Sequence, residues 1–290
     1  MNFPYSMQKL QDWFTQQWII IWGKKINPKE HKWLWGPFGE LDGIGENFIT
    51  QLAEKENLTI KRNCNSVGLL NSIQSLNLSD IEKNKLSDKV IDFYEKTADY
   101  NLVFKAKWNP IFKFFGIIVN RLFSQRINQL NIPTKQFDQS ETLTSEIIKL
   151  IDNQSKKVKY TIWLRKIEST GLIIYSGIYG TCKLPSGKIC IKAIFPLPKG
   201  NATVILKPNV GQNNELILES SGKKFGDPGF YFLLNDSKNN HWSQYHSSFT
   251  DELIVSEKEN SLNAKQELKL WNLRVVTFEY VINKTTKATD

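Results

Sequence analysis

The chain has 290 residues, of which 40% are hydrophobic and 12% aromatic, and its formal net charge is +9. This length and this apolar content suffice for one large domain or two ordinary ones, which argues against a largely disordered chain. The excess of Lys and Arg favours anionic neighbours, yet these residues are scattered and form no run, so no nucleic-acid partner is expected.

The N-terminal region, residues 1–139, has a mostly helical pattern and is rich in aromatic residues. Residues 5–22 place Leu, Ile, Phe and Trp at helical spacing with glutamines between them, which predicts an amphipathic helix. One interpretation of this helix is packing against the rest of the protein, and the other is peripheral contact with a membrane. In the glycine-rich connection that follows, Trp33, Trp35 and Phe38 need an apolar surface to cover, which suggests a lid or a plug.

Two further helices are predicted in this region. A capping box of Ser79 and Glu82 opens one that runs to about residue 97, and Pro110 suits the first turn of another. No secretory signal pattern begins the chain, and the longest apolar runs are too short to span a bilayer, so the expected location is cytoplasmic.

The C-terminal region, residues 140–284, consists of short apolar-alternating segments separated by Gly, Pro, Asn and Asp. The expected strands are 158–166, 172–182, 189–195, 202–207, 215–219, 230–234, 242–246, 251–256, 264–271 and 274–282. The predicted fold class is α+β, with the helical part packed on or plugging an antiparallel β-barrel or strongly curved meander sheet. Residues 285–290 are small and polar, which predicts a flexible tail.

A hairpin within this region sets two cysteines opposite each other. If residues 185–187 form a three-residue loop with Gly187 in the left-handed conformation, Cys182 faces Cys190 across the two strands. A bridge between them is geometrically feasible, but two reduced thiols suit a cytoplasmic chain better.

Alternation along the strands also identifies candidate ligand contacts. Arg165 shares a face with Trp163, and Lys192 shares one with Cys190, so both charges stand among residues that favour burial. If these faces line a lumen, each charge needs an anionic or carbonyl partner, whereas on a solvent-facing surface both are ordinary surface groups. The predicted ligand-binding residues are Arg165, Trp163, Lys192, Tyr175, Tyr231 and Tyr245.

Sequence motifs for catalysis are scarce. The three histidines have no HxH or HExxH spacing, and no GxSxG elbow or phosphate-binding loop is present, so neither a metal site nor a cofactor is expected. Acid and base chemistry in a dry cavity needs only a suitable side chain, which spacing does not reveal. The candidates for that role are Tyr231, His246, Asp227 and Glu146.

Residues 92–97, DFYEKT, together with residues 126–133 resemble uncharacterised bacterial proteins of the YndJ-like group. The resemblance implies no established activity. The strand region is similar in outline to lipocalin-like and other calycin barrels, but it lacks their early GxW signature, so the similarity concerns architecture alone.

The leading functional hypothesis is a binding protein that holds an apolar or amphipathic small molecule, lipid-like or polyketide-like and including an anionic one, between the sheet and the aromatic helices. A cofactor-independent isomerase, cyclase or hydrolase acting on such a molecule is one alternative. A peripheral membrane or assembly protein that uses the N-terminal helix as its anchor is the other.

Overall fold

The structure is a computed structural model that describes residues 10–40, 44–112, 140–259 and 261–285. The first predicted helix is present as α1 (Leu10–Trp22), and the start of that prediction lies outside the described residues. The same holds for most of the helix expected from Pro110 and for the tail at 286–290.

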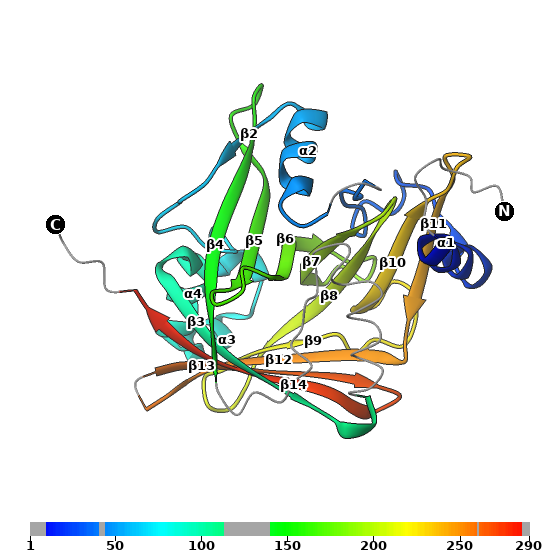
Figure 1. The fold of residues 1–290 in the computed structure, drawn as a ribbon. Helices are drawn as coiled ribbons and strands as arrows, with labels where there is room; N and C mark the ends of the chain where they lie inside the picture. The colour runs from blue at the N-terminus through cyan, green and yellow to red at the C-terminus, as the bar shows by residue number, and fades with distance from the viewer. Residues whose placement is uncertain (1–9, 41–43, 113–139, 260, 286–290) are drawn as a thin grey trace.

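Ten strands close into an antiparallel barrel, because β14 pairs with β3 at one seam and β9 pairs with both β8 and β12 at the other. Figure 1 shows β4 and β5 rising on one side of it and β12, β13 and β14 lying across its base. The barrel strands are β3 (Tyr100–Trp108), β4 (Glu141–Asp152), β5 (Val158–Ile167), β6 (Ile173–Lys183), β7 (Ile189–Leu197), β8 (Gly200–Val210), β9 (Leu216–Glu219), β12 (Phe249–Lys258), β13 (Ser261–Leu270) and β14 (Leu273–Lys284).

Strand β8 changes its pairing partner along its length. The first part of this strand, residues 200–205, pairs with β10 (Gly229–Asn235), whereas residues 207–210 pair with β9. β11 (His241–His246) and β1 (Lys24–Lys25) extend β10 into a flap that lies outside the closed ring. β2 (Leu58–Lys61) pairs with β4, also outside the ring.

The predicted strands are confirmed, but their connection as one simple meander is not. β10 and β11, which come between β9 and β12 in the sequence, lie outside the ring, and β9 pairs directly with β12. The ring of ten instead includes β3 and β4, which stand between β14 and β5. The barrel therefore draws one strand from the region before residue 140. Cys182 and Cys190 are direct cross-strand partners, as the hairpin predicts, and both are free thiols.

The segment between β2 and β3 closes one end of the barrel. It contains η1 (Ile73–Leu76), α3 (Asp80–Lys85), α4 (Asp88–Glu95) and η2 (Thr97–Asp99), and these elements touch β7, β8, β12 and β4 respectively. Val90, Phe93 and Tyr94 of α4 belong to the same buried cluster as the inward residues of the barrel. The expected helical plug is thus present, although it is short.

The predicted helix from Ser79 is two helices instead of one. The capping box is present, since Ser79 Oγ accepts from the Glu82 amide and the Glu82 carboxylate accepts from the Ser79 amide. Leu86 then turns to an extended conformation, and the Ser87 side chain caps α4 by accepting from the Lys89 amide. A second strong N-cap residue inside the apolar pattern therefore restarts the helix.

The outer face of the barrel is covered by two separate layers. α2 (Asn47–Glu56) packs Phe48 and Leu52 against outward side chains of β4, β5 and β6. Residues 26–38 cover β6, β7, β8 and β10, with Leu34 fully buried. Covering both faces explains why β6 is apolar on both.

The covering layer made by residues 26–38 is held by a buried side chain of β8. Asn201, fully buried, donates through Nδ2 to the carbonyl oxygens of Gly36 (3.3 Å) and Pro37 (3.1 Å). The expected lid or plug is therefore an outer cover, and Trp33, Trp35 and Phe38 pack against a buried cluster on the flap side that includes Leu34 and Leu233.

Replacing Asn201 with Ala should lower the free energy of unfolding by about 1–3 kcal/mol, because two carbonyl oxygens lose their buried donor. Urea unfolding monitored by tryptophan fluorescence measures this. The matched control is Asn213→Ala on an exposed residue, which should change stability little. Equal stability of Asn201→Ala and the wild type would contradict the assigned role.

Candidate binding site in the barrel lumen

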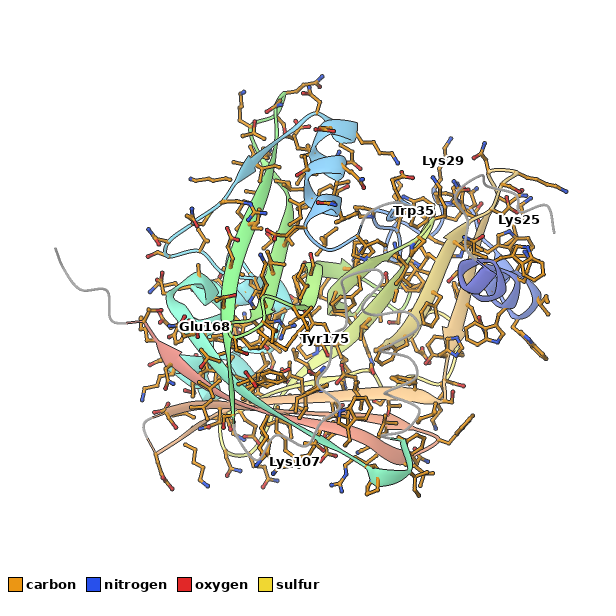
Figure 2. All side chains as sticks on the ribbon, viewed as in Figure 1. Lys25, Lys29, Trp35, Lys107, Glu168 and Tyr175 are labelled. Atoms are coloured by element: carbon orange, nitrogen blue, oxygen red, sulfur yellow. The ribbon has the colours of Figure 1, made fainter. Side chains whose placement is uncertain are left out.

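The barrel encloses a cavity of about 790 Å³. This volume lies in the upper part of the range that small-molecule sites occupy. Figure 2 places Tyr175 of β6 in the middle of the molecule, whereas Lys107 lies at its periphery. The cavity is lined by inward residues of the barrel strands, by Phe93 and Tyr94 of α4, and by Phe232 and His246 of the flap. It therefore occupies the barrel lumen, with α4 at one end, and it reaches the flap and α1, whose Trp18 also lines it.

Small residues on the inner face leave room for aromatic rings. A Cβ added at Gly177 would approach the Phe195 ring to 2.8 Å and the Tyr179 ring to 3.0 Å, so only glycine fits there without displacing them. Ala193 and Ala202 also line the cavity on the neighbouring strands. The lumen is thus lined by a mixture of rings and small side chains that leaves space unfilled.

Arg165 of β5 is the cation of this lumen. Its side chain is 7% exposed, and its guanidinium carbon lies 4.0 Å from the centre of the Trp163 ring and 4.5 Å from that of Tyr175. Its Nη2 donates to the Tyr179 hydroxyl at 3.1 Å, but its buried Nε has no hydrogen-bond partner in the described structure. None of the ion pairs between described residues includes Arg165. The charge is therefore stabilised by rings and neutral hydroxyls alone.

A group of buried tyrosines surrounds this guanidinium. Burial raises the pKa of Tyr280 to about 12 and that of Tyr175 well above its usual value, while the Arg165 charge acts in the opposite direction on both. Burial also raises the pKa of Tyr94 and Tyr179. All four hydroxyls stay protonated near neutral pH, so each is available as a hydrogen-bond donor.

Asp251 of β12 brings a carboxyl group to the cavity wall. It is 6% exposed, and burial raises the pKa of its carboxyl to about 7. Gln266 Nε2 donates to its Oδ2 at 2.7 Å, whereas its Oδ1 has no partner among the described residues. A carboxyl group in this setting is partly protonated near neutral pH.

Of the predicted ligand contacts, the structure brings Arg165, Trp163 and Tyr175 together on the cavity wall. Their role in binding stays a prediction. Lys192 does not line the cavity: it lies on the outer face, and its Nζ donates to the carbonyl oxygens of Trp33 (3.1 Å) and Trp35 (2.9 Å). Its charge is therefore partnered by the covering layer.

Tyr231 and Tyr245 also lie away from the cavity, on the outer side of the flap. The Tyr231 hydroxyl donates to the Asp227 carbonyl oxygen at 2.5 Å and accepts from the Gly226 amide at 3.0 Å. The Asp227 carboxylate accepts from the backbone amides of Lys223 and Lys224, so its role is structural.

The two remaining catalytic candidates differ in position. Glu146 lies outside the lumen in an ion pair with Arg62, at 3.2 Å. His246 lines the cavity, where its ring stacks on Trp18 with centroids 4.9 Å apart. Burial lowers the pKa of this histidine, and its Nε2 has no partner in the described structure.

The sequence reasoning missed Asp251, Gln266, Tyr179 and Tyr280. A signal for Asp251 was present, because along β12 it alternates with Phe249, Leu253 and Val255 and is thus a charge between apolar residues of one face. In the part of the chain that the structure describes, no group of three or more His, Cys, Asp or Glu side chains could hold a metal ion.

The fold and the cavity define a class of protein: a closed antiparallel β-barrel with an apolar lumen and a helical plug, consistent in outline with a calycin-like barrel. No family model and no solved structure matches the chain. The chain is similar to YndJ of Bacillus subtilis (strain 168), an uncharacterized membrane protein by its name, with 27% identity over 241 residues. The predicted YndJ-like resemblance is therefore confirmed.

The match to YndJ covers 82% of this chain but only 41% of YndJ itself. The chain thus spans less than half of the relative that it matches. Among the helices of the described residues, none combines the length and apolar character needed to cross a membrane.

The buried carboxyl makes a testable contribution to the pH dependence of stability. Because the folded pKa of Asp251, about 7, exceeds its ordinary value of 3.8, stability is greatest below about pH 4 for this group and falls as the pH rises towards 7. In Asp251→Asn this loss should be absent, so the variant gains stability relative to the wild type between pH 4 and 8, by an amount on the order of 4 kcal/mol. Urea unfolding at several pH values measures the difference, and a pH-independent difference would refute the raised pKa.

Proposed function

We propose that this protein binds an apolar or amphipathic small molecule, lipid-like or polyketide-like, in the lumen of its barrel, and that an anionic group of the molecule pairs with Arg165. The observation that supports this most directly is a large, mainly apolar cavity containing a buried guanidinium without a carboxylate partner. In contrast, the surface cations Lys55, Lys166 and Lys199 all have carboxylate partners.

The energetics of burial favour an anionic ligand group. A charge buried without an opposite charge is costly, and ring faces and neutral hydroxyls offset only part of that cost. A carboxylate or enolate would accept from the unpaired Nε and from the surrounding tyrosine hydroxyls. The aromatic walls would hold the apolar part of the molecule, since burying it there removes apolar surface from water.

A cytoplasmic location belongs to the same proposal. Cys182 and Cys190 lie directly opposite each other on adjacent strands and are unbridged, which suits a reducing compartment. Burial raises the pKa of Cys182 to about 11 and that of Cys190 to about 12, so both are unreactive thiols near neutral pH.

Catalysis without a cofactor is the alternative that Asp251 favours. A carboxyl group with a pKa near 7 in a largely apolar cavity is suited to accept or donate a proton, and the tyrosine hydroxyls near Arg165 could stabilise a developing oxyanion. An isomerase, cyclase or hydrolase of a lipid-like molecule would use the same lumen. Conversion of an added ligand to a product of different mass or retention time distinguishes this alternative from binding.

Peripheral membrane contact is favoured by the outer surface of α1. Ile21 is 70% exposed and Trp22 72% exposed, and Lys24 and Lys25 follow directly. Aromatic and basic side chains of this kind suit the interface of an anionic membrane. Flotation with anionic vesicles separates this alternative, which is compatible with ligand binding in the lumen.

The binding proposal predicts that Arg165→Met loses affinity for a fluorescent fatty acid, 11-(dansylamino)undecanoic acid, by at least about tenfold, because the carboxylate loses its charged partner. Titration of the delipidated protein, followed by dansyl emission, measures the affinity. The matched control is Arg274→Met, which removes an exposed arginine from β14 and should bind as the wild type does. Equal affinity of Arg165→Met and the wild type, with both folded by circular dichroism, would contradict the proposal.

A further inference from the structure

Asp251 is held firmly on the cavity wall by its own backbone. Its amide donates to Ser220 Oγ at 2.6 Å, and the Ser220 amide donates to the Asp251 carbonyl oxygen at 2.9 Å. Ser220 itself is 1% exposed. These contacts fix the backbone at Asp251 and therefore the position of its Cα on the cavity wall.

The carboxyl group is only half satisfied. Gln266 of the adjacent strand β13 occupies Oδ2, and Oδ1 is buried without a partner in the described residues. Buried polar atoms in proteins are paired in the great majority of cases, because leaving one unpaired costs about 1–3 kcal/mol. Both Asp251 and Gln266 line the cavity, so the unpaired acceptor is next to the space that a ligand would fill.

Arg165 and Asp251 stand on opposite walls. Along the ring of ten strands, β5 and β12 are five pairings apart in either direction. The two groups form no ion pair with each other or with another described residue, although both act electrostatically on Tyr175, Tyr179 and Tyr280. A molecule in the lumen would thus meet a cation on one wall and a hydrogen-bonding acid on the other.

We propose that Asp251 and Gln266 form a second polar subsite of the lumen, which binds a hydroxyl group of a ligand whose carboxylate is held by Arg165. This inference rests on the proposed binding function and narrows it to hydroxylated long-chain carboxylic acids. A hydroxyl suits the subsite in either state of Asp251, since it donates to the carboxylate and accepts from the carboxylic acid. A plain alkyl chain leaves Oδ1 unpaired, and a site built around a hydrogen bond discriminates against such an analogue.

The test is displacement of 11-(dansylamino)undecanoic acid from the delipidated full chain by palmitic acid and by a series of hydroxypalmitic acids that differ in hydroxyl position. At least one hydroxy acid is expected to bind about tenfold or more tightly than palmitic acid, the size of one well-made hydrogen bond in a dry site. Equal affinity of palmitic acid and every hydroxy acid for the wild type would overturn the subsite.

The matched variant is Asp251→Leu, which has a similar shape and no polar atoms. It should lose the preference for the hydroxy acid while binding palmitic acid at least as well as the wild type, and retention of the preference would overturn the subsite. Removal of a half-satisfied buried carboxyl should leave the variant folded, and Asp251→Asn, which keeps one donor and one acceptor, should retain part of the preference.

The outcomes for the subsite and for the binding function differ. If the wild type binds neither the probe nor any of the palmitic and hydroxypalmitic acids, the binding proposal itself is refuted. If both kinds of acid displace the probe equally and both depend on Arg165, the binding proposal stands and the subsite at Asp251 is refuted.

Discussion

The closure of the sheet around a buried guanidinium is the constraint on which the site depends. Once β8 pairs with β9 and β14 pairs with β3, every inward side chain of ten strands faces an enclosed space. Arg165 is then buried, at 7% exposure, and the Trp163 and Tyr175 rings lie against its planar group. An arginine is suited to this role because its delocalised charge is weakly hydrated and stacks on aromatic faces.

An unfilled lumen is possible because hydrophobic burial is distributed over three clusters. The plug and the inner wall make one, α2 on the outer face makes the second, and residues 26–38 on the flap side make the third. The outer clusters contain large, fully buried side chains such as Leu34, Ile49 and Ile148. Since these stabilise the sheet from outside, the inner face can combine rings with small residues and leave a cavity.

The positions of strands were predictable because each has a clear alternation of side chains and ends at turn residues. β4 was missed, since its sequence ETLTSEIIKLID mixes charged and apolar residues without strict alternation. The exit of β10 and β11 from the ring was not predictable from local pattern, because it depends on the division of β8 between β9 and β10 and on the pairing of β9 with β12.

The site residues show how far alternation reaches. The alternation of side chains correctly placed Arg165 and Trp163 on the same face, because both lie on one strand. Alternation within one strand does not show which face of another strand points into the barrel. The register across the Cys182–Cys190 hairpin holds that information: it pairs Tyr179 with Ala193, so Lys192 must point to the opposite face. To place Asp251, the pairing of strands must be known around the whole barrel, because only the closed ring brings it opposite Arg165.

The most direct measurement is mass spectrometry of an organic extract of the purified protein, compared with an extract of Arg165→Met prepared in the same way. The wild type is expected to release an apolar or amphipathic acid in near-stoichiometric amount, and the variant is expected to release much less. An extract of the wild type that contains no such molecule, from a protein that also takes up none when long-chain acids are supplied, would contradict this expectation.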